Sequence, residues 1–306
     1  MNTGIEFLLS KVSEVQSADG AFSSTVHWGT KRHQDWNGFT TALVLRALHA
    51  LPACDALRGI RERALGFLLK CAATDPPGAF SFWPAGAQPR WIPEPLPPDA
   101  DDTAVYAVEL ARHGCLDQRA MRRIACLALV PFRLREIDQP APTWLRPGVF
   151  FTWLRREDRA NVVDCCANAN VVAFLAYSRQ AHMPGYREAC AMIENAIRWA
   201  GDSRVRARSL SPFYAHPVEL LYAVEHAVQC GAESLRPSLS LLRDRQWARE
   251  DGADEAEVVD LDRPICSNAY GGVFWTSRAL QMARTLGCRS ESVAIREGKE
   301  NCKMET

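Results

Sequence analysis

The sequence has no excess of charge of either sign and no long apolar segment. It holds 36 Lys and Arg residues against 36 Asp and Glu residues. This balance gives no general argument for nucleic acid or an anionic membrane surface as a partner. No run of about 18 uninterrupted apolar residues occurs, so we expect no membrane span. The N-terminal segment carries Glu6 early and lacks a long apolar core, which is not typical of a secretory signal.

Cysteine is present without any sign of an oxidising compartment. Eleven cysteines in a chain without a predicted signal peptide indicate reduced thiols and a cytoplasmic protein. Cys165 and Cys166 are adjacent, which argues against a structural disulfide between them. The chain has 306 residues and is 47% hydrophobic, enough for one large domain or two small ones.

Strand-like alternation is scarce, and apolar residues instead recur at helical spacing through most of the chain. This pattern predicts helices over 2–15, 37–50, 55–72, 99–113, 117–129, 164–179, 185–200, 214–230, 234–247 and 268–286. Glycine and proline lie in the loops, most densely between Asp75 and Pro98. We expect one helical domain over residues 1–286 and a polar C-terminal tail over 287–306.

A weak internal repeat organises these helices. "GIEFLL" at 4–9 precedes "DGAFSS" at 19–24, and "ALGFLL" at 64–69 precedes "PGAFSF" at 77–82. Each time a helix ends, a Gly-Ala-Phe turn follows, and a second helix begins. Repeated helix pairs predict stacked hairpins, as an open solenoid or a closed toroid. Five hairpins are clear, and a sixth would lie in 130–160, where "GVFFTWL" also fits a strand.

The second helix of each pair is the more apolar, so we place these helices on the inside. Their N-terminal ends would then share one end of the barrel. Polar and aromatic groups gathering at a concave mouth indicate a binding site. The group expected there comprises Trp36, Asn37, the aspartates at 99–102, Asp164, Asn168, Asn170, Tyr214, His216, Asn268 and Tyr270.

The segment "DADDTA" at 99–104 places three aspartates at the start of one inner helix. It matches the DxDDTA motif of class II terpene cyclases such as the squalene–hopene cyclases, and the helix hairpins resemble the repeats of the terpene cyclase and prenyltransferase superfamily. The resemblance implies an all-α fold, a single α/α toroid of five or six helix hairpins. It also implies that Asp101 is the proton donor, with Asp99 and Asp102 shaping its hydrogen bonding and Thr103 beside the substrate.

The chemistry of such an enzyme requires a carboxylic acid that stays protonated near neutral pH. A free aspartic acid has a pKa of about 3.9 and would be ionised. Several carboxyl groups in one apolar pocket cannot all ionise, because like charges repel in a low dielectric. The helix N-terminus opposes this effect because it favours the carboxylate. Burial and mutual repulsion must therefore outweigh the helix dipole.

A carbocation formed by protonation needs neighbours that are electron-rich but not nucleophilic. Aromatic faces meet this need through cation–π attraction of about 0.5–2 kcal/mol each. The chain offers several aromatic candidates for substrate contact: Trp36, Trp83, Trp91, Tyr214, Tyr270 and Trp275. Asn168 and Asn170 follow on the next inner helix as polar candidates.

The chain departs from the family in its length, since family cyclases usually pair two such barrels. Either one barrel suffices, or a partner subunit or second copy completes the cavity, or the acid motif has another use. The substrate would be a small-molecule isoprenoid. Protonation requires no cofactor, and magnesium enters only with a diphosphate substrate. No DDxxD motif is present, which argues against ionisation of a diphosphate by a magnesium cluster.

A second site remains open beside the aspartates. Asp164 and Cys166 form an Asp-x-Cys pair at the start of one inner helix, and His216 lies at the start of the next. Protein prenyltransferases of the same superfamily use such a set to hold zinc, and three protein ligands leave an open catalytic position. The alternative function is therefore a zinc-dependent prenyltransferase-like enzyme. In a simpler interpretation, Asp164 caps its helix and the cysteines pack in the core.

A third interpretation is a toroid without catalytic activity that binds an isoprenoid or a protein. The aspartates would then be a helix cap and an acidic edge. The cyclase interpretation predicts that Asp101→Asn loses catalytic activity. The zinc prenyltransferase interpretation predicts that Cys166→Ser loses it.

Overall fold

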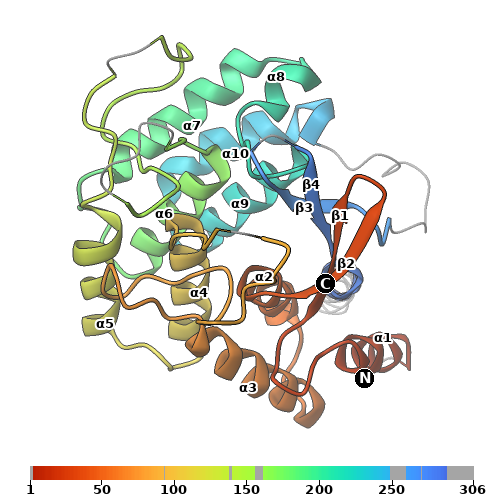
Figure 1. Ribbon diagram of the computed structural model, residues 1–306. Helices are drawn as coiled ribbons and strands as arrows, with labels where there is room; N and C mark the ends of the chain where they lie inside the picture. The colour runs from red at the N-terminus through yellow and green to blue at the C-terminus, as the bar shows by residue number, and fades with distance from the viewer. Residues whose placement is uncertain are drawn as a thin grey trace, which may run out of the picture.

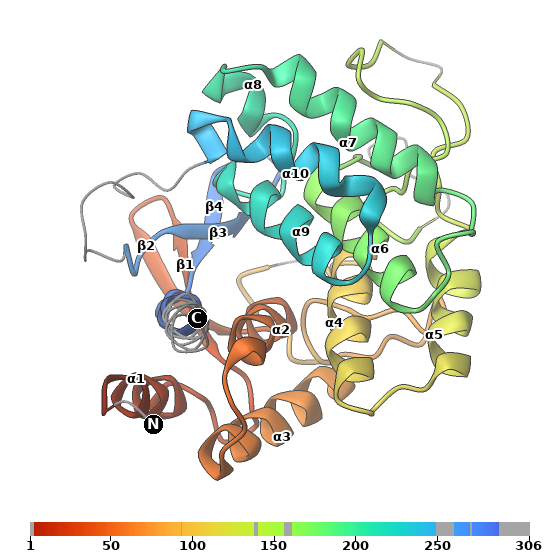
Figure 2. The ribbon, with the colours of Figure 1, turned by 180° about the vertical axis from the view of Figure 1, so that it is seen from behind.

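The computed structural model describes residues 3–92, 94–137, 140–155, 161–248, 260–269 and 271–287. An inner set of helices surrounds a common axis, which Figure 2 views almost end-on. This inner set consists of α2 (Gly38–Ala47), α4 (Ala100–Arg112), α6 (Cys165–Tyr177), α9 (Val218–Gln229) and the helical residues 278–287. Consecutive members pack side by side, α2 on α4, α4 on α6, and α6 on α9.

An outer set of helices covers the inner one (Figure 1). It consists of α1 (Thr3–Glu14), α3 (Asp55–Lys70), α5 (Gln118–Ile124), α7 (Tyr186–Ala200) and α10 (Arg236–Arg243). The ring closes where Arg284 donates two hydrogen bonds to Glu219 of α9, and where Gly287 lies against Ala47 of α2. The described part of the chain is therefore one α/α toroid of five helix hairpins, which confirms the predicted fold class.

Shorter helical pieces complete the connections between these helices. A π-helical turn over Ala125–Leu129 extends α5, and α8 covers Arg204–Arg208. Single 3-10 turns lie at Leu48–Ala50, Glu233–Leu235 and Gln246–Ala248. Within the described residues of 130–160 no helix follows the π-helical turn, so the sixth hairpin is not formed there. In the segment "GVFFTWL", Phe150 and Trp153 make isolated bridges to Arg133 and Asp99.

Burial explains which helices lie inside. Every residue of α4 from Ala100 to Leu110 is buried, as expected for a helix enclosed on all sides. On α7, by contrast, a buried stripe through Ala189, Ile193 and Ala196 alternates with exposed charge. The outer helices thus bury one face only, as their sequence periodicity predicts.

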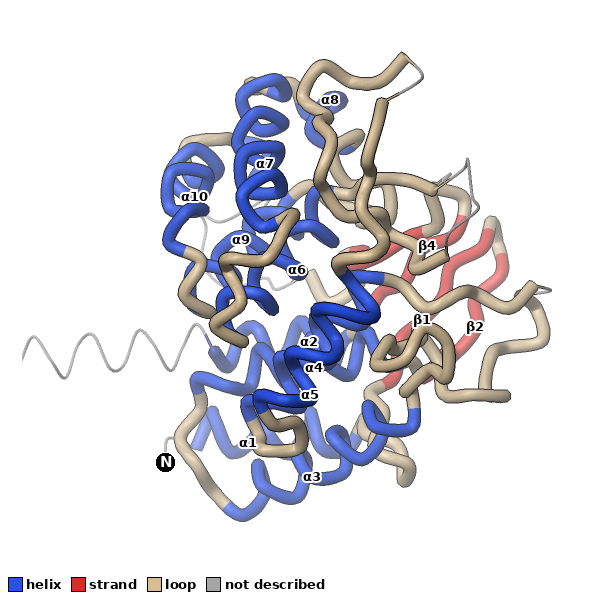
Figure 3. Tube along the Cα trace, turned by 90° about the vertical axis from the view of Figure 1, so that its left-hand side faces the viewer, coloured by secondary structure: helices blue, strands red, loops and turns tan. Residues whose placement is uncertain are grey.

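The strands are the main departure from the predicted elements. A four-stranded antiparallel sheet has the order β2-β1-β4-β3 and lies on one side of the helices (Figure 3). Its strands are β1 (Ser23–Trp28), β2 (Lys31–Trp36), β3 (Pro264–Ser267) and β4 (Val273–Thr276). The predicted helix 268–286 is therefore wrong in its first part, since the helix begins only after Ser277. The apolar run in β4 is too short to distinguish strand from helix by periodicity.

The Gly-Ala-Phe turns of the repeat have the same backbone form. Gly20 and Gly78 adopt φ angles of +99° and +89°, and Gly148 does so at +93° in a third Gly-x-Phe turn. These angles favour glycine. A Cβ atom at Gly20 would also lie 2.0 Å from the backbone oxygen of Arg63, so no side chain fits there.

Each of these turns is tied to the inner helix that follows it. The backbone N–H of the turn phenylalanine donates to a side chain four residues after the helix cap. The pairs are Phe22 with Thr41, Phe80 with Thr103, and Phe150 with Asn168. The repeat therefore has a physical basis, because each turn needs a polar side chain at this helix position to accept a buried N–H.

The expectations about membrane spans and cysteine pairing concern residues that the structure describes. Among the helices there, none is both long enough and apolar enough to cross a bilayer. The nine cysteines of the described residues are free, including the adjacent Cys165 and Cys166. Most of the expected polar tail, residues 288–306, lies outside the described residues.

Candidate active site

The three aspartates of "DADDTA" begin α4 and are all buried. Asp99 is the N-cap, and its Oδ1 accepts a hydrogen bond of 2.6 Å from the backbone N–H of Asp102. The exposed fractions of Asp99, Asp101 and Asp102 are 8%, 8% and 1%. A capped helix with a solvated acidic edge therefore does not describe this site, because only Asp99 caps and none of the three faces bulk water.

Asp101 is held between two other elements of the toroid. Its Oδ1 accepts a hydrogen bond of 2.7 Å from Nδ2 of Asn170, on α6. Its Oδ2 accepts one of 2.6 Å from the hydroxyl of Tyr214, in the segment before α9. Both oxygens of the Asp101 carboxyl thus accept hydrogen bonds from Asn170 and Tyr214, and not from Asp99 or Asp102.

The pKa values of these acids are displaced toward the protonated form. Burial raises the pKa of Asp101, although hydrogen bonds from Tyr214 and Asn170 and the nearby Arg46 act in the opposite direction. Burial and the charge of Asp101 raise the pKa of Asp99 to about 7. Burial and the charge of Asp99 raise that of Asp102 well above its usual range. A cluster of this kind retains protons at pH values where isolated aspartates have lost them.

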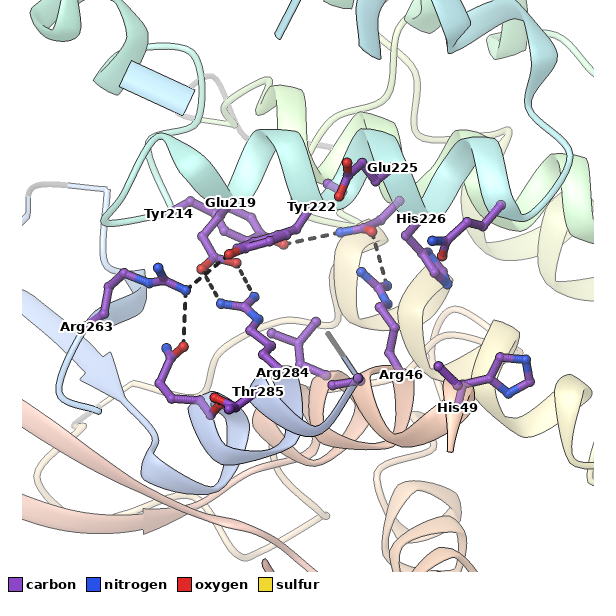
Figure 4. Close-up of a pocket in the computed structure, with 18 of the residues that line it drawn as sticks. Arg46, His49, Tyr214, Glu219, Tyr222, Glu225, His226, Arg263, Arg284 and Thr285 are labelled. Carbon is purple, nitrogen blue, oxygen red and sulfur yellow. Dashed lines mark hydrogen bonds and ion pairs between the residues drawn. The ribbon is translucent and has the colours of Figure 1, made fainter. Parts of the chain in front are cut away.

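A cavity of about 590 Å³ lies between α2, α9 and the helical residues 278–287 (Figure 4). Asn170 and Tyr214, the two partners of Asp101, line it. It extends toward Arg46 and His49 at the end of α2, Arg112 at the end of α4, and His226 near the end of α9. The acid therefore lies directly behind the wall at one end of a cavity large enough for a small ligand.

Arg46 fixes the orientation of Asn170. Its Nη2 donates to Oδ1 of Asn170 over 3.2 Å, which leaves the amide nitrogen of Asn170 to face Asp101. That same nitrogen also donates to the Tyr214 hydroxyl at 3.2 Å, so the hydroxyl hydrogen is available for Asp101. After Asp101 loses a proton, these donors stabilise the resulting carboxylate.

The tryptophans proposed for substrate contact lie on the sheet side and not among the residues lining this cavity. Trp36 is 46% exposed at the end of β2. Trp91 stacks on His33 with ring centroids 5.3 Å apart and lies 6.5 Å from the ring of Trp275. Of the proposed aromatic residues that the structure describes, Tyr214 alone lines the cavity, while Tyr270 lies outside the described residues.

Trp83 and Trp275 share a structural partner, Asp35, that no motif in the sequence singled out. The indole N–H of Trp83 donates to Oδ1 of Asp35, and that of Trp275 donates to Oδ2, both over 2.9 Å. Asn37, the N-cap of α2, donates to the same Oδ2 at 2.8 Å. Asp35 is 2% exposed and joins both halves of the sheet to the first inner helix. Its only sequence signal is a carboxylate two residues before a helix cap.

Thr103 and Asn168 hold backbone groups in place. The hydroxyl oxygen of Thr103 accepts from Phe80. The Asn168 amide accepts from the backbone N–H of Phe150 and donates to the backbone oxygens of Phe150 and Asp164. Both side chains are buried against the Gly-x-Phe turns that they hold, which accounts for their presence without a substrate.

The residues expected for a zinc site do not form one. Both oxygens of Asp164 accept backbone N–H groups, Oδ1 from Cys166 and Ala167 and Oδ2 from Phe213. Nδ1 of His216 accepts from the backbone N–H of Val218. Among the described residues, no three His, Cys, Asp or Glu side chains are arranged to hold a metal ion. The structure therefore corrects the Asp164, Cys166 and His216 set to a helix cap, a core cysteine and a capping histidine.

The comparisons with known proteins give structural similarity only. No protein-family model matches the sequence, and no curated protein matches it. Two variants of the type II terpene cyclase MstE from Scytonema, each solved with geranylgeranyl dihydroxybenzoate, share 14% identity and a TM-score of 0.43 with this chain. The first match covers 94% of this chain and 95% of the cyclase, and the second covers 92% and 94%.

A protein from Actinoplanes shares 16% identity and a TM-score of 0.41, over 94% of this chain and 99% of that one. Similarity at this level carries no argument about chemistry.

Proposed function

We propose that this chain is a class II terpene cyclase-like enzyme that starts the cyclisation of a linear isoprenoid by protonation. The observation that carries the proposal is Asp101, a buried carboxyl group with a raised pKa. Its two oxygens accept hydrogen bonds from Asn170 and Tyr214, which line the cavity. A strong general acid held directly behind the cavity wall supports protonation of a neutral alkene or epoxide bound there.

The reaction balances within one molecule of substrate. Asp101 gives its proton to one carbon of a terminal alkene, or to an epoxide oxygen, and the π bond or C–O bond breaks to leave a carbocation. A second alkene of the same chain attacks the cationic carbon and closes a ring. Loss of a proton from the product cation ends the reaction, and solvent returns a proton to Asp101. The product is therefore an isomer of the substrate.

The neighbours of Asp101 favour the transition state more than the ground state. Negative charge develops on the carboxyl oxygens as the proton leaves, and the Tyr214 and Asn170 donors already point at both of them. Preorganised donors of this kind stabilise developing charge without reorganisation. The ring of Tyr214, which packs edge-on against Phe39 at 5.8 Å, is the cavity residue best placed to face the cation.

A single toroid is sufficient for this proposal. The cavity volume of about 590 Å³ lies within the range of about 300–1,000 Å³ that small-molecule sites occupy. Its wall is formed by residues of this one chain, mainly of α2, α9 and the helical residues 278–287. We therefore propose an isoprenoid substrate bound along the axis of one barrel, without a second subunit. Protonation by Asp101 draws on no cofactor.

The test is an incubation with geranyl, farnesyl and geranylgeranyl diphosphate, squalene and oxidosqualene, with products identified by mass spectrometry after phosphatase treatment. Wild type is compared with Asp101→Asn and with the matched Asp117→Asn, which changes the exposed cap of α5. A cyclic isomer formed by wild type and Asp117→Asn but not by Asp101→Asn supports the proposal. Folded wild-type protein that converts none of the five substrates contradicts it and favours a binding toroid.

A further inference from the structure

Asp164 is fully buried at the N-terminus of α6, and its two oxygens serve different parts of the chain. Oδ1 accepts the backbone N–H groups of Cys166 and Ala167, at 2.7 and 3.1 Å, which is the ordinary role of a helix cap. Oδ2 accepts the backbone N–H of Phe213 at 3.1 Å, from a residue 49 positions away in the sequence. The second oxygen therefore joins α6 to the segment that precedes α9, which capping alone does not require.

The cap of α6 does not need this second oxygen. The first N–H of the helix, on Cys165, donates to the backbone oxygen of Leu210 at 2.9 Å. At the equivalent position of α2, the neutral side chain of Asn37 is a sufficient cap. An amide has one acceptor oxygen, whereas a carboxyl group has two. Asp164 can therefore accept from its helix and from Phe213 at the same time.

The turn over 211–214 leads to Tyr214 and is held from two sides. It closes where the backbone N–H of Tyr214 donates to the backbone oxygen of Ser211 at 3.0 Å. On the side of α6, the Ser211 hydroxyl accepts a backbone N–H of that helix at 3.0 Å, beside the contact of Phe213. On the other side, the backbone N–H of Ser267 in β3 donates to the oxygen of Phe213 at 2.8 Å. Contacts to α6 and β3 thus fix a segment that is neither helix nor strand.

Tyr214 extends from this turn to the acid. Its ring lies edge-on to Phe39, with centroids 5.8 Å apart, and its hydroxyl donates to Oδ2 of Asp101 at 2.6 Å. Hydrogen bonds weaken steeply when their length or angle departs from the optimum. The backbone position of Tyr214 is set by the turn, so a displaced turn moves the hydroxyl away from Asp101.

Asp164 and Asp101 also interact through space. Burial raises the pKa of Asp164 to about 7, and the charge of Asp101 adds to this shift. Further titratable groups interact with Asp101 from the surrounding elements: Arg46 of α2, Asp99 and Asp102 of α4, Cys166 of α6, Tyr214, and Cys266 of β3. A substitution at 164 leaves all of these side chains unchanged, so their contributions are common to wild type and variant.

We propose that Asp164 is a positioning residue for the acid, which holds the turn over 211–214 so that the Tyr214 hydroxyl bonds Asp101. This hydrogen-bond arrangement is independent of the proposed function, whereas its effect on turnover rests on that function. A donor that stabilises the Asp101 carboxylate must be in place before the proton leaves. Loss of the contact between Asp164 and Phe213 therefore has the same consequence for Asp101 as loss of the Tyr214 hydroxyl.

The test compares wild type with Asp164→Asn, Tyr214→Phe and the double variant. Asparagine still caps α6 with its one acceptor oxygen, but it has no second acceptor for the N–H of Phe213. Carbon NMR of labelled aspartate carboxyl groups measures the pKa of Asp101 in the protein without substrate, and the spectrum of Asp101→Asn assigns the signal. We expect Asp164→Asn to raise this pKa, because the hydrogen bond from Tyr214 lowers it in wild type. The double variant should show no rise beyond that of Tyr214→Phe.

A direct effect of charge at 164 has the opposite sign, because removing a negative neighbour lowers the pKa of a carboxyl group. A pKa of Asp101 that falls or stays in place in Asp164→Asn overturns the proposal, as does a rise of equal size in the Tyr214→Phe background. The control is Asp117→Asn, which changes the exposed cap of α5 and should leave the pKa of Asp101 unchanged.

A second variant keeps the proposal testable if Asp164→Asn does not fold. Ser211→Ala removes the other side-chain contact between α6 and the turn, so it should also raise the pKa of Asp101. An unchanged pKa in that variant overturns the proposal.

Turnover provides the second readout. Asp164→Asn should lower kcat by about tenfold, as Tyr214→Phe does, with KM little changed. The two proposals fail separately. A raised pKa of Asp101 in Asp164→Asn, without any cyclic product from wild type, retains the positioning role and removes the cyclase. Cyclisation by wild type, with the pKa of Asp101 unchanged in Asp164→Asn, does the reverse.

Discussion

The two ends of the inner helices carry opposite chemistry. At the N-terminal ends lie buried acids, Asp101 on α4 and Asp164 at the cap of α6, whose pKa values are raised. At the C-terminal ends lie buried bases, Arg46 and His226, whose pKa values are lowered. The helix dipole favours the charged form at both ends, yet both shifts run toward the neutral form. Burial therefore outweighs the dipole at both ends of the inner helices.

The acidic residue Asp101 and the tryptophans Trp83 and Trp275 differ in what they contact. Asp101 faces the cavity through Asn170 and Tyr214, whereas Trp83 and Trp275 face Asp35 in the sheet. Under the proposed function the first group serves the chemistry, whereas the second group links the sheet to the first inner helix. Substitutions at the two places should accordingly change different measured quantities.

The largest expected effect comes from removing the acid. Asp101→Asn keeps the shape of the side chain but has no carboxyl proton to donate, so turnover should fall by about 10²–10⁴-fold. Substrate binding should change little, because the cavity wall is preserved. The measurement is the single-turnover rate beside a binding titration. A rate within threefold of wild type would remove Asp101 from the mechanism.

Asp35→Asn should give the largest loss of stability. It replaces one acceptor oxygen by a donor, opposite the N–H groups of Trp83, Trp275 and Asn37. A buried donor left without a partner costs about 1–3 kcal/mol. Urea unfolding followed by tryptophan fluorescence measures this cost. The exposed Asp55→Asn serves as the control, and equal stability of the two variants would refute the role assigned to Asp35.

Tyr214→Phe should lower turnover by about tenfold and shift its pH dependence. The hydroxyl lowers the pKa of Asp101, so its removal raises that pKa further. The acid then stays protonated to higher pH, and the alkaline limb of the kcat/KM profile moves upward. Tyr186→Phe on α7 is the matched control. An alkaline limb that moves downward or stays in place contradicts this hydrogen bond.

A smaller effect is expected in the pH dependence of stability. The pKa of Asp99 is about 7 in the folded state against an ordinary value of 3.8, so the folded state binds more protons between these pH values. The free energy of unfolding therefore falls as pH rises through this window.

Asp99→Asn keeps a capping side chain and removes the titration. We expect it to be more stable than wild type at pH 8 by on the order of 1 kcal/mol, and to lose this advantage near pH 4. Urea unfolding at both pH values measures the difference, with Asp117→Asn on the exposed cap of α5 as the control. A variant that is less stable than wild type at pH 8 would show that Asp99 is favoured as a carboxylate.

The sequence predicted the helix pairs and their inner and outer positions because both depend on local periodicity. It also predicted that Asn170 and Tyr214 gather with the aspartates at one end of the inner helices. That inference needed only the repeat, since repeats place equivalent helix starts at the same level. The Gly-x-Phe turns could be predicted from the sequence for the same reason, because they recur with the repeat.

The sheet and the basic end of the cavity could not be predicted in this way. β1 and β4 pair across about 250 residues, as at Val26 and Trp275, and no local pattern reports such a contact. Arg46, Arg112 and His226 belong to no motif, and their proximity depends on closure of the ring. The tryptophans were proposed for the cavity from their chemistry alone, and only tertiary structure reveals that Asp35 holds two of them.

The most direct test of the central claim is cyclisation in deuterium oxide. If Asp101 protonates the substrate with a proton drawn from solvent, each cyclic product should carry one deuterium at the carbon, or the oxygen of an opened epoxide, that received it. A diphosphate substrate should keep its diphosphate. A cyclic product without deuterium from an alkene substrate, or one formed with release of diphosphate, would show that cyclisation does not begin with protonation by Asp101.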